Sequence, residues 1–173
     1  KRSREIHEIN KQLKGLVSTG TKTDQGSTLE KGERPFILLK VDWDDALGPR
    51  LKEQYPEGIE IGVPLKDVGI QLFNASTLIY GQECISSAEG ILVNMENLKL
   101  QGYAFFDSFP DESQRAGNNQ YMIAIIAPFI SYFQSLKIKN ILQEASESIK
   151  KKKKLDLEFI WEQVGEIFQQ ASD

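Results

Sequence analysis

Three closely spaced carboxylates are the residues of this sequence best suited to chemistry. Asp42, Asp44 and Asp45 flank Trp43 in the stretch PFILLKVDWDDALGPRLKEQYP, residues 35–56. They could act in acid–base catalysis or bind a divalent cation, since the period of a strand points Asp42 and Asp44 to one face. No further ligand follows at the spacing of a calcium-binding loop. Because short carboxylates favour turns over sheet, we favour a structural role at a strand end.

The other residue types that do chemistry are sparse. The sequence has one cysteine, Cys84, and one histidine, His7, separated by a linker. A zinc site needs three or four such ligands, and a Cys–His nucleophile pair needs direct contact, so we expect neither. The sequence contains no phosphate-binding Gly-rich loop of either common spacing and no Gly-x-Ser-x-Gly turn. We therefore expect no catalytic residue, no metal and no cofactor.

Length and charge narrow the class of protein further. The 173 residues suit one domain with an appendage, and the net charge of −4 argues against a general nucleic-acid binder. No apolar run is long enough to span a membrane. A single cysteine is typical of a reducing setting, so we expect a cytoplasmic protein.

A run of five lysines raises the alternative of a weak, peripheral contact with an anionic membrane. These residues are Lys150, Lys151, Lys152, Lys153 and Lys154. We favour a solvated helix end instead, because cations complement the helix dipole there.

The first 34 residues are expected to stand apart from the domain. Apolar residues recur at helical spacing over residues 3–17, which predicts an appended amphipathic helix. That apolar face comprises Ile6, Ile9, Leu13, Leu16 and Val17. Residues 18–34 are rich in Gly, Ser, Thr and charge, which indicates a flexible linker. We therefore divide the chain into residues 1–34, helix and linker, and residues 35–173, the globular domain.

Hydrophobic patterns in the domain predict five strands and three helices. The expected strands are residues 36–43, 50–54, 91–95, 98–107 and 121–127, with a tight hairpin at Glu96-Asn97. The expected helices are residues 64–80, residues 129–150, and a last helix from Leu155. This order predicts an α/β domain of the α+β type, with helices packed on a five-stranded, mainly antiparallel sheet.

The helix over residues 64–80 is apolar around most of its circumference. One stripe, suited to the sheet, comprises Leu65, Val68, Leu72, Ala75 and Ile79. A second arc comprises Ile70, Phe73, Thr77 and Tyr80. Either the terminal helices cover this second arc within the chain, or it binds a partner or a second copy. We take these four residues as the candidate partner-binding site.

The strand–turn–strand stretch also resembles the longin-like domains of nitrogen-permease-regulator-like, folliculin and DENN-type proteins. The similarity lies in residues 42–45 and in Leu51 and Gln54, together with four residues of structural character. Those four are Gly48, Pro49, Tyr55 and Pro56. The element order over residues 35–170 also follows the longin pattern. The single-domain context suggests a simpler, archaeal relative of the large eukaryotic members.

The resemblance implies a non-enzymatic scaffold in small-GTPase regulation or vesicle trafficking. Its expected partners are a small GTPase, another longin- or roadblock-type chain, or a second copy in a dimer. The alternative is a small-molecule sensor or enzyme on the same α/β shape, which would need a concave pocket with convergent polar groups.

Overall fold

The structure is a computed structural model that describes Glu8, Lys11 and residues 36–59, 61–80 and 88–170. The elements, in chain order, are β1 (Ile37–Asp44), β2 (Gly48–Tyr55), α2 (Leu65–Tyr80), β3 (Glu89–Met95), the 3₁₀ helix η1 (Glu96–Leu98), β4 (Leu100–Pro110), β5 (Asn118–Ala127), α3 (Tyr132–Lys150) and α4 (Leu157–Gln170). The strands form one antiparallel sheet in the order β2-β1-β5-β4-β3. The predicted α+β fold with a five-stranded sheet is confirmed.

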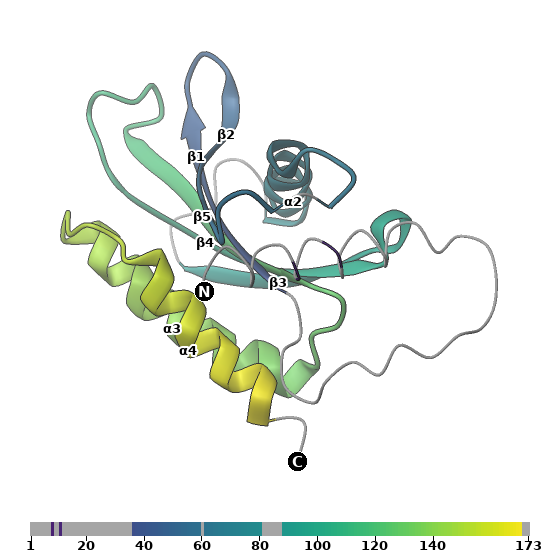
Figure 1. The fold of residues 1–173 in the computed structure, drawn as a ribbon. Helices are drawn as coiled ribbons and strands as arrows, with labels where there is room; N and C mark the ends of the chain where they lie inside the picture. Colours follow the sequence, from purple (N-terminus) through teal and green to yellow (C-terminus); the bar gives the residue numbers. More distant parts are fainter. Residues whose placement is uncertain (1–7, 9–10, 12–35, 60, 81–87, 171–173) are drawn as a thin grey trace, which may run out of the picture.

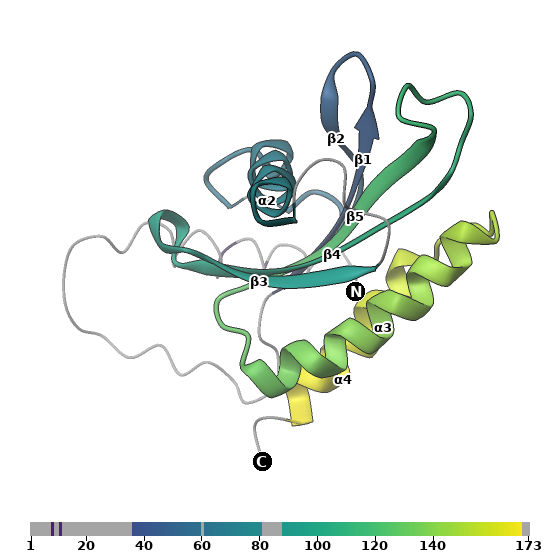
Figure 2. The ribbon, with the colours of Figure 1, turned by 180° about the vertical axis from the view of Figure 1, so that it is seen from behind.

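Helices cover both faces of this sheet (Figures 1 and 2). The helix α2 lies on one face, and α3 and α4 lie side by side on the other. Alternate residues of β1 enter the two resulting cores: Leu39 and Val41 pack toward α2, whereas Leu38, like Phe36 just before the strand, packs toward α3 and α4. The continuous apolar run of β1 follows from its interior position, because both faces of this strand are covered.

The β1–β2 hairpin has the geometry that its turn residues favour. Gly48 has a φ of 77°, in the left-handed region that glycine adopts without strain. Pro49 stands opposite Trp43 on β2, an edge strand, where a missing N–H costs little. The strand ends at Tyr55, and the peptide bond from Tyr55 to Pro56 is cis.

Two predicted boundaries were wrong at the connections around β4 and β5. The hairpin expected at Glu96-Asn97 is present, since β3 and β4 pair antiparallel, but its connection is the 3₁₀ turn η1 followed by Lys99 in the left-handed conformation, and β4 begins at Leu100. The helix predicted from residue 129 begins at Tyr132. Ser131 caps it: its hydroxyl accepts from the Gln134 backbone N–H, and the Gln134 side chain accepts from the Ser131 N–H.

The last helix begins two residues later than predicted. Asp156 accepts a hydrogen bond from the backbone N–H of Phe159 at 3.1 Å, which caps α4 and places its first residue at Leu157. The lysine run does end α3, whose last residue is Lys150.

Several predictions fall outside the described residues. Glu8 and Lys11 are both helical and exposed, but the rest of residues 1–35 is not described. The linker, the boundary at residue 34, His7 and Cys84 therefore stay untested.

Candidate functional site

Two of the three strand-end carboxylates have partners close by in sequence. Asp42 forms an ion pair with Lys40, with Nζ 2.8 Å from Oδ1. Asp44 accepts hydrogen bonds from the backbone N–H groups of Ala46 and Leu47 at 2.9 and 3.0 Å. These two bonds hold the pKa of Asp44 below its usual value. Asp44 thus organises the turn, as its type favours.

The third carboxylate joins two loops. Asp45 accepts from the Trp43 indole N–H at 3.3 Å and from the backbone N–H of Arg115 at 2.7 Å. The second bond connects the β1–β2 turn to the β4–β5 loop. In the described part of the chain, no group of three or more His, Cys, Asp or Glu side chains has an arrangement that could hold a metal ion. Asp44 and Asp45 thus stabilise the turn and the neighbouring loop, and Asp42 is paired with Lys40 on the strand.

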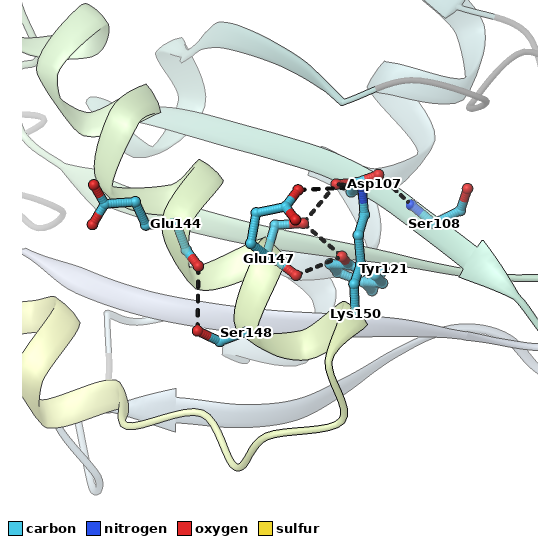
Figure 3. Close-up of polar contacts among 8 residues, drawn as sticks. Asp107, Ser108, Tyr121, Glu144, Glu147, Ser148 and Lys150 are labelled. Carbon is cyan, nitrogen blue, oxygen red and sulfur yellow. Dashed lines mark hydrogen bonds and ion pairs between the residues drawn. The ribbon is translucent and has the colours of Figure 1, made fainter.

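A buried polar cluster joins α3 to the sheet (Figure 3). Tyr121 of β5 lies 2.5 Å from the Ser146 hydroxyl of α3, and Ser146 donates to Asp107 Oδ2 of β4 at 2.6 Å. Lys150 Nζ lies 2.9 Å from the same oxygen. The other Asp107 oxygen accepts from the Ser108 N–H at 2.8 Å. Since Ser146 donates to the carboxylate, Tyr121 donates to Ser146.

This cluster contains residue types found in reaction centres, but its side chains are not accessible to a substrate. Tyr121, Ser146 and Asp107 are all buried, and only Lys150 reaches the surface. A substrate would have to displace α3 to meet the Ser146 hydroxyl. The arrangement can therefore hold α3 in register on β4 and β5. The sequence pattern alone did not predict this cluster, although Asp107 interrupts the apolar run FFDSF and Ser146 falls on the buried side of its helix.

The cluster raises the pKa of two groups, the Tyr121 hydroxyl and the Lys150 ammonium group. Burial raises the pKa of the Tyr121 hydroxyl, and the Asp107 charge raises it further. The hydrogen bond to Asp107 raises the pKa of Lys150. The folded state therefore keeps protons that the unfolded chain releases, and this contribution to stability is present at neutral pH and lost in alkali.

We predict a loss of stability above pH 10, the ordinary pKa of tyrosine, that depends on Tyr121. Once the pH exceeds that value, the free energy of unfolding should fall by up to about 1.4 kcal/mol per pH unit from this one group. Urea unfolding at pH 8, 10 and 11 checks this prediction, with Tyr121→Phe as the comparison. The variant should have a shallower decline, and parallel curves would contradict the prediction.

The candidate partner-binding residues on α2 need a correction. Phe73 is 0% exposed, and its ring lies between Trp43 and Phe106, with centroid distances of 5.9 and 5.6 Å. It packs on the sheet, so it is not open to another chain. The C-terminal helices do not cover it, because α3 and α4 lie on the opposite face. Residues 3–17, the other group expected to cover this arc, lie outside the described residues except Glu8 and Lys11.

The other members of that arc are not brought together as an exposed surface. Ile70 and Thr77 are half-buried, and the Thr77 hydroxyl donates to the carbonyl of Asn74 at 2.8 Å. Tyr80 is helical, but its side chain lies outside the described residues. Leu72 and Phe73 both lie on the buried face of α2. Ile79, which we predicted to face the sheet, is exposed.

An exposed apolar surface lies instead at the start of α3. We call it the α3 stripe: Phe129, Tyr132, Phe133 and Leu136, with exposed fractions of 55%, 68%, 75% and 44%. The rings of Tyr132 and Phe133 meet edge to face at a centroid distance of 5.9 Å. The helix α3 turns Ser135 and Ile138 inward and leaves Phe133 at the surface. Exposed apolar patches on a protein surface are a general feature of interaction sites.

A second surface feature lies between the edge strand β2 and the connection from α3 to α4. This open hollow of about 720 Å³ is lined by charges of both signs, among them Lys52, Glu53, Lys154 and Asp156. Of the lysine run, Lys150 is paired with Asp107, and the other four residues are exposed. Among the described helices, none is long and apolar enough to cross a membrane.

Comparison with known proteins assigns no family to the chain. A scan against protein-family models gives no match, and a search of curated proteins finds no significant relative.

Proposed function

We propose that the protein is a non-enzymatic interaction scaffold of the longin-like kind, acting in small-GTPase regulation or membrane trafficking. The observation that carries the proposal is the α3 stripe, four large apolar side chains exposed together at the start of one helix. The order of elements, two strands, a helix, three strands and two helices, adds support from the resemblance noted in the sequence.

The α3 stripe has the properties of a binding surface. Its anchors are mainly aromatic, and such side chains often supply most of the energy of a protein interface. They lie on or beside a helix whose first turn is fixed by a capping box, so they are presented in a defined geometry. Burying this surface would remove apolar side chains from water at little cost in ordering the backbone.

The expected partner is a small GTPase, with another longin- or roadblock-type chain or a second copy as the alternatives. Each would meet the stripe with an apolar patch of its own. The polar cluster beneath α3 suits this role, because it holds the helix that carries the stripe in register on the sheet.

We predict that Phe133→Glu abolishes partner capture and leaves the fold intact. Phe133 is the most exposed aromatic residue of the stripe, so a charge there should disrupt an interface without disturbing the core. The measurement is capture of purified small GTPases from the same genome, each loaded with GDP or a GTP analogue, by the immobilised chain.

The matched control is Phe159→Glu, which changes an exposed phenylalanine of α4 outside the stripe. Both variants should melt like the wild type. If the wild type captures a partner and Phe133→Glu captures it equally well, the stripe is not the interface. If the chain captures no GTPase, no longin-type chain and no second copy, that result would contradict the proposal of an interaction scaffold.

The hollow beside β2 keeps a second candidate function open, that of a small-molecule sensor. Its volume lies within the range of ligand sites, but its lining is charged rather than apolar. Thermal melting against a panel of nucleotides and metabolites separates the two functions. A reproducible shift that Lys52→Glu removes, with no protein partner found, would favour the sensor.

A further inference from the structure

The hollow beside β2 follows the edge of the sheet. Four successive residues of β2, residues 52–55, all line it. Gln54 pairs with Leu39, which packs toward α2, whereas Tyr55 pairs with Leu38, which packs toward α3 and α4. Because paired residues of two strands point to the same face, the lining comes from both faces of β2. The hollow therefore lies along the outer edge of this strand rather than on one face of the sheet.

Backbone groups of β2 are unpaired along this edge. Within the described chain, β1 is the only strand that pairs with β2. Alternate N–H and C=O groups of an edge strand point away from its neighbour and have no partner in the ladder. Among the described residues, no backbone hydrogen bond of a turn or loop involves residues 52–55. The hollow thus follows backbone donors and acceptors along roughly 13 Å of strand.

The opposite wall of the hollow is held in place. It consists of residues 154–157, in the connection from α3 to α4. Just before it, the backbone N–H of Lys153 donates to the carbonyl of Ser148 at 3.0 Å. Leu155 and Leu157 are partly buried and pack against the core beneath α3 and α4. The volume of about 720 Å³ is therefore preformed, so a ligand has little protein structure to order when it binds.

Three charged side chains of this lining have no charged partner. In the described part of the chain, none of Lys52, Glu53 and Lys154 forms an ion pair. All three are exposed. Charges of both signs beside unpaired backbone groups are complementary to a ligand that carries amide groups and charges of both signs.

We infer that this hollow binds an extended peptide segment of a partner protein, which adds a strand to the sheet at β2. Main-chain hydrogen bonds to β2 hold the segment, and Lys52, Glu53 and Lys154 select acidic and basic side chains on it. Pro49 and the charges of β2 disfavour pairing with the same strand of a second copy, as they do on other edge strands. The site lies outside the α3 stripe, so the inference does not depend on the proposed function.

Peptide selection followed by N-methylation tests the inference on the full-length chain. A displayed library of random nine-residue peptides is selected against the wild type, and the affinity of each enriched peptide is measured by fluorescence anisotropy. Each peptide is then made in two forms, N-methylated at its odd or at its even positions. Only alternate N–H groups of a strand face its neighbour, so one form should bind at least about tenfold more weakly and the other should bind like the parent peptide.

Variants and hydrogen exchange locate the bound peptide. Lys154→Glu changes an exposed charge of the hollow and should weaken binding at least about tenfold, whereas Phe133→Glu, in the α3 stripe, should leave it unchanged. The bound peptide should also slow amide exchange in β2 and leave exchange in the first turn of α3 as it was.

Each outcome supports or overturns the inference. One disabling and one tolerated methylation pattern, with binding lost in Lys154→Glu and kept in Phe133→Glu, supports it. Equal effects of the two patterns would show that no strand is added. Peptides that bind Lys154→Glu as tightly as the wild type, or that slow exchange only in α3, would place the site elsewhere. If no peptide is enriched, the hollow is not a peptide site, and a metabolite shift removed by Lys52→Glu would then identify a small-molecule site.

Discussion

Replacing Phe73 by alanine should lower the free energy of unfolding by about 3–5 kcal/mol, because it empties the centre of the core under α2. The Phe73 ring is fully buried, stacks near Trp43 and meets Phe106 edge to face. A cavity at that position cannot collapse easily, since the sheet fixes two of its walls. Urea unfolding followed by circular dichroism gives the change in free energy.

Phe73→Leu is the matched control, because it keeps most of the volume and should cost clearly less than the alanine change. Ile79→Ala, on the same helix but exposed, should be close to neutral. A loss below about 1 kcal/mol for Phe73→Ala would show that α2 packs on the sheet in another orientation.

The position of Phe73 shows where a helical pattern stops being informative. The apolar arc of α2 is wide enough that several rotations bury a plausible stripe, and periodicity does not choose among them. The choice depends on the surface that the helix meets. Here Gly69 and Gly102 allow close approach, since a Cβ on either would lie 2.9 Å from Val41 or Leu72. The contact of α2 with the sheet at these glycines depends on how the strands pair. The residues of α2 alone do not determine that pairing.

The strands themselves were predictable because each has a local signal. The continuous apolar run of β1, the polar edge strand β2 and the turn at Gly48 all depend on neighbours in sequence. The order β2-β1-β5-β4-β3 does not, because β1 and β5 meet across about 80 residues. The types of the elements and the α+β class could therefore be predicted from the sequence, whereas the order of the strands in the sheet could be seen only in the structure.

The side chains that α3 exposes and buries were the least predictable part. Phe133 fits the apolar period of α3, yet it is exposed, while Ser135 and Ser146 of the same helix are buried. Asp107 and Ser146 are polar residues in apolar surroundings, which is itself a signal that they have partners. Their sequence separation of 39 residues hides which partners those are.

Removing the acid of the buried cluster should be the second most damaging change. Asp107→Ala is expected to lower the free energy of unfolding by about 3 kcal/mol, at the lower end for a broken buried ion pair because Lys150 can turn to solvent. The partly buried Ser108 N–H and the buried Ser146 hydroxyl both lose this acceptor, and a buried hydroxyl left without one costs stability.

Asp107→Asn separates charge from hydrogen bonding. The amide keeps the size of the side chain and one acceptor for Ser146 but cannot form the ion pair with Lys150, so it should cost less than alanine. Lys150→Met tests the other side of the pair and leaves the Asp107 charge buried with only its two remaining hydrogen bonds. Unfolding of all three variants at pH 7, with the double variant Asp107→Ala/Lys150→Met, gives the coupling between the two residues. A coupling close to zero would mean that Lys150 contributes nothing to anchoring α3, and that the Tyr121–Ser146–Asp107 hydrogen bonds alone hold the helix on the sheet.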